Sequence, residues 1–259
     1  MLIVFDVGNT ETTIGLFDGE RLVAHWRIMT AIARTADEFG LLLRGLLDAA
    51  GIAPASVRHA AIGSVVPPIT EPLSHACERY LDARVILVDA RAPLPIQLDV
   101  DEPLTVGADR LINTLAASRL YGCDTICVDL GTATTFDCIT ADGVFLGGVI
   151  MPGVRTSAET LARRTSKLPS TELVPPLRTI GRRTEECIRA GVLFGAADAI
   201  DGIVRRIKAE WPRPGVPMVV ATGGLAETLQ AWCTEFDRVE PFLTLRGLQM
   251  AHVLLAAGV

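Results

Sequence analysis

One short pattern occurs twice in this chain of 259 residues, and it constrains the fold more than any other feature. Residues 2–10 combine a strongly apolar run with Asp6, Gly8 and Thr10. Residues 126–135 repeat the apolar run, the aspartate, the glycine two positions later and the hydroxyl side chains. Each apolar run predicts a strand that is buried on both faces and ends in a turn. The chain is therefore expected to contain two similar strand-turn units.

The segments that follow the two copies also match. A second apolar strand is expected at residues 13–17 and again at 135–139, and an Asp-Gly pair follows each, at 18–19 and 142–143. An Asp-Gly pair between apolar runs is a strong hairpin signal. Repetition of both the strands and the turns indicates two related domains. A third buried strand, within residues 218–226, runs into a Gly-Gly turn before a helix.

The first turn has two interpretations that the residues alone leave open. A carboxylate such as Asp6 at the end of a strand can hold a hydrated Mg²⁺. Gly8 lets backbone N–H groups approach an anion, and Thr10 can add a hydroxyl donor. The same residues also suit an ordinary strand followed by an Asx-type turn.

Composition removes several function classes. The chain has two lysines, Lys167 and Lys208, and neither lies in the Gly-x-x-x-x-Gly-Lys loop of P-loop proteins; the Gly-x-Gly-x-x-Gly fingerprint is absent too. Bound phosphate would have to be met by a metal, backbone amides, hydroxyls and arginine. A net charge of −6 without a basic stripe argues against nucleic acid as a partner.

No targeting or membrane segment is expected. No apolar run approaches the roughly 20 residues of a membrane span. Met1 leads directly into a strand without a basic segment, which argues against a signal peptide. We therefore expect a cytoplasmic protein.

The order of the remaining elements suggests where the domains divide. The first half reads as three strands, a helix with a capping box at Thr35, a strand stopped at residues 67–68, a helix from about Pro72, and a strand. An extended, proline-containing segment at 92–105 follows, and then a helix. We place an N-terminal domain over 1–115 and a C-terminal domain over 116–259.

The start of that next helix carries a candidate catalytic pair. Asp109 and Arg110 lie in its first turn, directly after Gly107 and Ala108. The aspartate suits plain capping, because a carboxylate complements the helix dipole. It also suits proton abstraction from a substrate hydroxyl while Arg110 holds a carboxylate in a fork.

The paired hairpins and the later Gly-Gly turn resemble the acetate and sugar kinase/actin superfamily. That resemblance implies an α/β fold of two ribonuclease H-like domains facing each other across a cleft. More specifically, the chain is similar to type III pantothenate kinases. The segments that carry this similarity are Asp6-Val7-Gly8-Asn9-Thr10, Gly107-Ala108-Asp109-Arg110-Leu111-Ile112-Asn113, Asp129-Leu130-Gly131-Thr132-Ala133-Thr134-Thr135, Gly147-Gly148 with Pro152-Gly153, and Leu243-Thr244-Leu245-Arg246-Gly247-Leu248.

The similarity implies ATP-dependent phosphorylation of pantothenate to 4'-phosphopantothenate, the first step of coenzyme A biosynthesis. It implies an ATP phosphate loop made of Asp6, Val7, Gly8, Asn9, Thr10, Glu11, Thr12 and Thr13. Thr132 would also contact ATP. We expect Asp6 to hold Mg²⁺, either directly or through water.

The pantothenate site implied by the similarity consists of Gly107, Ala108, Asp109 and Arg110, with Asp109 as the proton acceptor, and of Thr184. Two further properties belong to the family. Asp129 would bind a monovalent cation, K⁺ or NH₄⁺, and the protein would be a homodimer with its substrate sites near the subunit interface.

Two departures from the family pattern concern the substrate pocket. Val100 stands where a tyrosine is frequent, and Arg182-Arg183 precede Thr184 where Lys-Asn is common. Arginine keeps the charge of lysine but not its shape. Two alternative functions remain open at this point: a catalytically weak accessory or regulatory relative, and another small-molecule kinase of the same superfamily.

Overall fold

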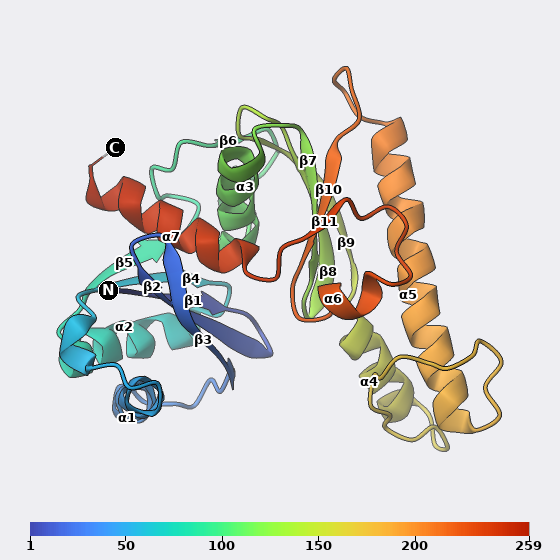
Figure 1. Ribbon diagram of the computed structural model, residues 1–259, viewed down its shortest axis with the longest axis horizontal. Coiled ribbons are helices and arrows are strands. Elements are labelled where there is room, and N and C mark those ends of the chain that lie inside the picture. Colours follow the sequence, from blue (N-terminus) through green and yellow to red (C-terminus); the bar gives the residue numbers. More distant parts are fainter. Residues whose placement is uncertain (259) are drawn as a thin grey trace. The chain divides into compact units, whose positions relative to one another are not determined.

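The structure is a computed structural model that describes residues 1–258 (Figure 1). It contains two compact units. The first unit comprises Met1–Leu120, Gly143–Phe145 and the segment from Leu243 onward, and the second comprises Tyr121–Asp142 and Leu146–Phe242. Each unit is described by itself below.

The first unit follows the expected order of strands and helices. Its elements are β1 (Leu2–Val7), β2 (Glu11–Asp18), β3 (Arg21–Met29), α1 (Ala36–Ala49), β4 (His59–Ser64), α2 (Pro67–Leu81), β5 (Arg84–Val88), β6 (Gln97–Leu98), α3 (Ala108–Tyr121) and α7 (Leu243–Ala256), with short 3-10 helices at Pro54–Ser56 and Pro103–Thr105.

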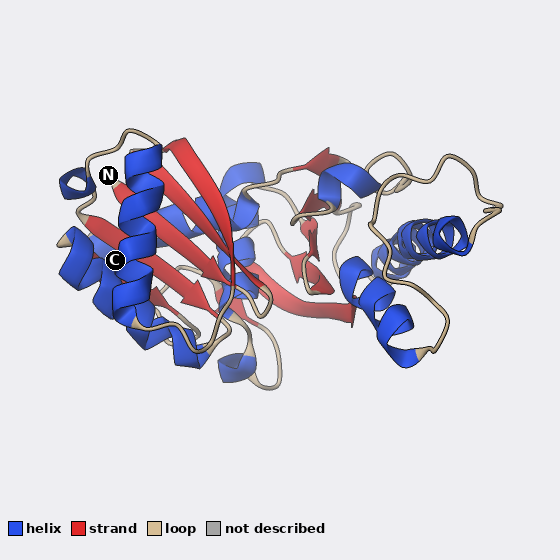
Figure 2. Ribbon diagram, turned by 90° about the horizontal axis from the view of Figure 1, so that it is seen from below, coloured by secondary structure: helices blue, strands red, loops and turns tan. Residues whose placement is uncertain are grey.

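Five strands of this unit form one twisted sheet in the order β3-β2-β1-β4-β5 (Figure 2). The first hairpins are antiparallel, whereas β4 and β5 run parallel to β1. Helices α1 and α2 lie on one face and α7 lies on the other (Figure 1). Strand β1 is buried on both faces for this reason: Ile3 and Phe5 belong to the core with α1 and α2, while Val4 lies on the opposite side.

Local signals explain the starts of α1 and α2, and the start predicted for α2 was wrong. The capping box is present as predicted, because the Thr35 hydroxyl accepts from Glu38 N–H while the Glu38 carboxylate accepts from Thr35 N–H. The prediction that the second helix begins near Pro72 is wrong, since α2 begins at Pro67. Proline fits the first turn of a helix, where backbone N–H groups have no intrahelical acceptor, so Pro67 and Pro68 start the helix as well as ending the strand before it.

The second unit repeats the sheet of the first. Its elements are β7 (Thr125–Leu130), β8 (Ala133–Ile139), β9 (Val144–Pro152), α4 (Val154–Arg164), α5 (Thr184–Ala209), β10 (Met218–Thr222), α6 (Ala226–Leu229) and β11 (Arg238–Val239). These strands lie in the order β9-β8-β7-β10-β11, with β7 and β8 antiparallel and β10 and β11 parallel to β7. Strand β6 adds a sixth, edge strand, pairing with β9 at Val144 and Phe145.

The two sheets share one strand order. If β7 to β11 are counted as the first to fifth strands of the second unit, both sheets have the order third, second, first, fourth and fifth. This shared order, with an antiparallel first and second strand and parallel fourth and fifth strands in both units, confirms two related ribonuclease H-like units. In the second unit, residues of α4, α5 and α6 pack on one face of the sheet to form its core (Figure 1).

Helix α7 groups with the first unit although it ends the chain. A Cβ placed on Gly15 of β2 would lie 3.0 Å from Leu245 Cδ1, and one on Gly63 of β4 would lie 3.2 Å from Leu248 Cδ2. The compact units thus differ from the division at residues 115 and 116, because α7 packs on the N-terminal sheet. The sequence pattern had no means of assigning a terminal helix to one sheet or the other.

None of the helices within residues 1–258 is both long enough and apolar enough to span a membrane.

Prediction 1 concerns His252 of α7, which is buried with its ring centroid 5.0 Å from that of His59. Burial, followed by the neighbouring His59, lowers the pKa of His252 below its usual 6.5. The unfolded chain therefore binds more protons in this range, so stability is complete above about pH 6.5 and falls as the pH decreases below that value. Urea unfolding at about pH 7.5 and 5.5 should show this loss.

His252→Asn should reduce the dependence of unfolding free energy on pH, whatever its effect on stability at neutral pH. The control is His75→Asn, because His75 is exposed on α2. Equal pH dependence in wild type and His252→Asn would contradict the prediction.

Candidate active site

The first hairpin turn lies at the end of β1, where residues 8–10 leave the sheet. Asp6 pairs with Thr13 of β2, and Gly8 N–H donates to Glu11 O at 3.1 Å to close the turn. Asp6 is half-buried and Asn9 is exposed. The turn therefore presents backbone and hydroxyl groups at the carboxyl end of β1, as the sequence predicted.

Thr30 fixes this turn, and it was not identified from the sequence. Its hydroxyl donates to Gly8 O at 2.7 Å and lies 2.9 Å from the Thr12 hydroxyl. Its backbone N–H donates to Thr10 O at 2.9 Å. The residue directly follows β3, so only the sheet register brings it beside the turn. The sequence offered one signal for this role of Thr30, namely a hydroxyl side chain directly after the third predicted strand.

The Gly-Ala-Asp-Arg segment lies beside the same end of the sheet. Gly63 of β4 pairs with Asp6 of β1, and a Cβ on Gly63 would lie 3.8 Å from Ala108 Cβ and would collide with Ile112 Cδ1. A Cβ on Gly107 would lie 3.4 Å from Val65 Cγ1, and Val65 N–H donates to Val7 O at 3.1 Å. The structure thus brings together two motifs that lie about a hundred residues apart.

Asp109 occupies the first turn of α3 and is half-buried. Its Oδ1 accepts from the Arg110 backbone N–H at 3.0 Å. Burial raises the pKa of Asp109, while the Arg110 N–H and the Arg110 charge act in the opposite direction. A carboxylate with a raised pKa is a stronger base once it is ionised, which suits proton abstraction.

Arg110 stacks on an aromatic ring within the first unit. Its Cζ lies 4.9 Å from the centroid of the Phe145 ring, which is fully buried. Such a cation–π contact orients the planar guanidinium. Arg110 is three residues after Gly107, which lies beside the end of the sheet where the hairpin turn lies.

The second hairpin has the same geometry with one residue fewer in its turn. Asp129 pairs with Thr135, as Asp6 pairs with Thr13, and Gly131 N–H donates to Ala133 O at 3.1 Å. This register makes Thr134, which pairs with Leu130, the equivalent of Thr12. Both of these threonines are buried.

Two glycines allow backbone segments to approach this second turn closely. Gly153 N–H donates to Thr132 O at 3.2 Å, as Thr30 N–H does to Thr10 O, and a Cβ on Gly153 would collide with Thr132 O. Gly223 follows β10 with a φ of +89°, and a Cβ there would lie 2.6 Å from Asp129 Oδ1. The Gly-Gly turn noted in the sequence therefore lies against the Asp129 carboxylate.

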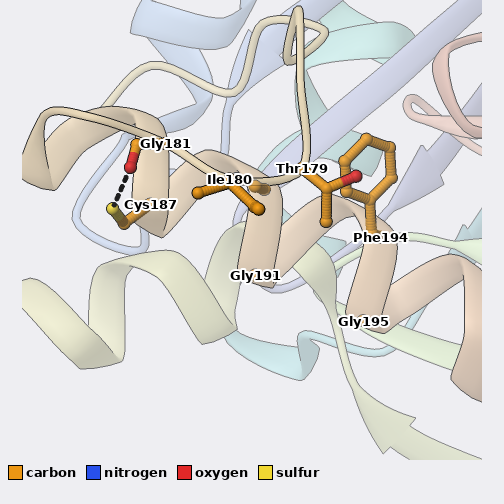
Figure 3. Close-up of a pocket in the computed structure, with 8 residues that line it drawn as sticks. Thr179, Ile180, Gly181, Cys187, Gly191, Phe194 and Gly195 are labelled. Atoms are coloured by element: carbon orange, nitrogen blue, oxygen red, sulfur yellow. Dashed lines mark hydrogen bonds between the residues drawn. The ribbon is translucent and has the colours of Figure 1, made fainter.

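Thr184 is the first residue of α5, and it is exposed. Beside it, a cavity of about 470 Å³ lies between the segment before α5 and that helix (Figure 3). The lining residues are Thr179, Ile180, Gly181, Cys187, Ala190, Gly191, Phe194 and Gly195.

Comparison with known proteins identifies relatives over nearly the whole chain. Residues 2–206 match the family model described as type III pantothenate kinase. A type III pantothenate kinase from Anaeromyxobacter sp. strain K is 44% identical over 252 residues, covering 97% of this chain and 98% of the relative. The one from Roseiflexus castenholzii is 45% identical over 252 residues, with the same coverage of both chains.

Solved structures share the fold at low sequence identity. A putative Baf family transcriptional activator from Campylobacter jejuni is similar with a TM-score of 0.56 and 16% identity, covering 98% of this chain and 99% of that one. A putative 2-dehydro-3-deoxygalactonokinase from Sinorhizobium meliloti gives a TM-score of 0.56 at 14% identity, with the same coverage. These similarities support the fold assigned above.

Prediction 2 concerns Gly153, whose φ of −66° and ψ of 156° are open to any residue. The cost of Gly153→Ala therefore comes from contact alone, because the added methyl meets Thr132 O and lies 2.5 Å from Gly131 O. We expect a loss of about 1–3 kcal/mol in unfolding free energy, measured by urea unfolding.

The matched control is Gly202→Ala in the interior of α5, where an added Cβ meets nothing within 4 Å. This control should be neutral or more stable by about 0.5–1 kcal/mol. If the Gly153 variant is as stable as the control, the close backbone approach at the second turn has no energetic importance.

Proposed function

Because the chain belongs to the type III pantothenate kinase family and so phosphorylates pantothenate with ATP, we propose that Asp109 is its general base. One observation carries this proposal: a half-buried carboxylate of raised pKa begins α3 beside the strand ends that bear the Asp6 turn. A base needs both a suitable pKa and a place next to the phosphate donor.

In the proposed reaction, the terminal hydroxyl of pantothenate gives its proton to the Asp109 carboxylate. The hydroxyl oxygen forms a bond to the terminal phosphorus of ATP while the bond to the ADP oxygen breaks. The products are 4'-phosphopantothenate and ADP. Arg110 holds the pantothenate carboxylate in its fork, with Gly107 and Ala108 supplying backbone N–H groups at the start of α3.

The phosphate loop proposed for ATP runs from Asp6 to Thr13. Gly8 leaves room for the phosphates and Thr10 can donate its hydroxyl. Thr132 in the second hairpin contributes a further contact from an exposed position. Among residues 1–258, no group of three or more His, Cys, Asp or Glu side chains could hold a metal by itself. That fits Mg²⁺, which is usually held by one or two carboxylates, water and substrate phosphates, with Asp6 as the carboxylate here.

Asp129 is proposed to bind a monovalent cation, K⁺ or NH₄⁺. The carboxylate ends β7, and the Gly223 backbone approaches it closely. Backbone and carboxylate oxygens together suit a weakly bound cation. When bound, the cation offsets negative charge near the phosphates.

Thr184 is proposed to contact pantothenate, and the protein is proposed to act as a homodimer in the cytoplasm. Ile180, which lines the cavity beside α5, and Leu177, three residues before it, are strongly exposed apolar residues, which supports burial against a second subunit. The net charge of −6 supports the proposal that nucleic acid is not a partner.

Prediction 3 is that Asp109→Asn lowers kcat by about 10²–10⁴-fold, the range expected for loss of a general base. Asparagine has nearly the same shape and its Oδ1 can still accept from the Arg110 N–H, so the melting temperature should barely change. The assay contains ATP, Mg²⁺, K⁺ and pantothenate, with a parallel panel of sugars as acceptors. Asp48→Asn, at an exposed position of α1, is the control.

Turnover of the Asp109 variant close to that of wild type would refute the general-base role. Phosphorylation of a sugar in preference to pantothenate would refute the proposed substrate site.

Prediction 4 is that activity rises with K⁺ at fixed Mg²⁺, and that Asp129→Asn flattens this response. The amide keeps an oxygen ligand but removes the charge that attracts the cation. KCl is titrated against choline chloride at constant ionic strength. Equal rates of the wild-type protein in both salts would show that Asp129 has a different role.

A further inference from the structure

A second arginine lies at the phosphate-loop end of the first unit, in the segment between β3 and α1. Thr30 begins this segment and is bound to Gly8 O and Thr10 O. A turn follows, in which Arg34 N–H donates to Ala31 O at 3.1 Å. Arg34 is therefore only four residues from a threonine that contacts the turn on two sides.

The guanidinium of Arg34 is held in place but lacks a protein partner. Its Cζ lies 5.2 Å from the ring centroid of Phe39, a residue that is 2% exposed in the core under α1. Its Nη1 is buried and has no hydrogen-bond partner among residues 1–258. A buried donor without an acceptor costs free energy, and a charged one costs more. The residue as a whole is half-buried.

Two acidic side chains of this region are engaged with other residues. The Glu38 carboxylate accepts from Thr35 N–H at 2.7 Å and from the Thr35 hydroxyl at 3.0 Å. These two bonds are the main cause of the low pKa of Glu38, and the charge of Arg34 is the smallest favourable contribution. At the same end of the sheet, Glu11 pairs with Arg27 at 3.5 Å. Arg34 thus remains a cation whose charge the nearby side chains compensate weakly.

The proposed phosphate loop needs such a cation. ATP brings several negative charges to a turn that already contains the Asp6 carboxylate. The chain has only two lysines, and Lys208 pairs with Glu235 at 2.8 Å in the second unit. We propose that Arg34 binds a phosphate group of ATP at the Gly8–Thr10 turn. This inference rests on the proposed phosphate loop, and it adds a residue outside that loop.

Prediction 5 tests this inference by calorimetric titration of the full-length protein with the magnesium complex of adenylyl imidodiphosphate, a non-hydrolysable ATP analogue. Arg34→Gln should weaken binding on the order of tenfold, because it removes a charge-assisted hydrogen bond. The KM for ATP should rise similarly, while the KM for pantothenate stays within about twofold of wild type. Arg34→Lys should restore part of the affinity, because it returns the charge without the fork.

The matched control is Arg21→Gln, which removes the same charge at the opposite end of β3. Arg21 is highly exposed and lies 4.0 Å from Asp18. Its variant should bind the analogue as wild type does. Equal affinity in the Arg34→Gln and Arg21→Gln proteins would overturn the inference, and so would a rise in the KM for pantothenate alone. A purely structural role would lower the melting temperature of Arg34→Gln without changing these constants, which also overturns it.

Asp6→Ala in the same titration separates this inference from the proposed phosphate loop. If Asp6→Ala weakens binding and Arg34→Gln does not, the inference about Arg34 fails and the loop stands. If neither variant changes the affinity, both fail. Weaker binding in the Arg34 variant supports the inference whatever the Asp6 variant shows.

Discussion

The packing of α3 between two glycines is the contact on which the first unit's site depends. Gly63 of β4 lies against Ile112 on one side, and Gly247 of α7 lies against Ile112 on another, where a Cβ would lie 2.5 Å from its Cγ2 and its carbonyl oxygen. Larger residues at these positions would push the helix outward. Because Asp109 lies one turn before Ile112, its distance from the Asp6 turn depends on these two missing side chains. Packing around Ile112 thus determines where the Asp109 carboxylate lies.

The two units support equivalent hairpin turns with different residues. Both turns receive a backbone N–H bond from the residue that follows the third strand, Thr30 in one unit and Gly153 in the other. Thr30 adds a hydroxyl that binds Gly8 O and reaches Thr12. At Gly153 a side chain would collide with the turn. The first turn is therefore supported by the Thr30 hydroxyl. The second is supported by the close backbone contact of Gly153 and by the Thr156 hydroxyl, which donates to Thr132 O at 2.7 Å.

Much of this could be predicted from the sequence, because the repeated motif is local and strongly patterned. The buried first strand, the capping box at Thr35 and the start of α5 at Thr184 all depend on neighbouring residues. The missed features have one local cause and one that depends on distant residues. The start of α2 was placed too late because Pro67 serves two elements at once. Thr30 and the approach of Gly223 to Asp129 arise only when strands from different parts of the chain pair in register.

The same comparison shows what a phosphate bound at either turn would meet. Each hairpin carries a carboxylate, Asp6 or Asp129, on the next-to-last residue of its first strand, directly before the turn. A carboxylate repels phosphate, so a turn of this kind can bind phosphate well only where positive charge lies between or beside the two groups. Lysine is nearly absent from the chain, and the two turns have no lysine in them. Metal ions and arginine are the remaining sources of charge. A guanidinium held on Phe39 costs less to order on binding than a free side chain, which makes Arg34 well suited to this purpose.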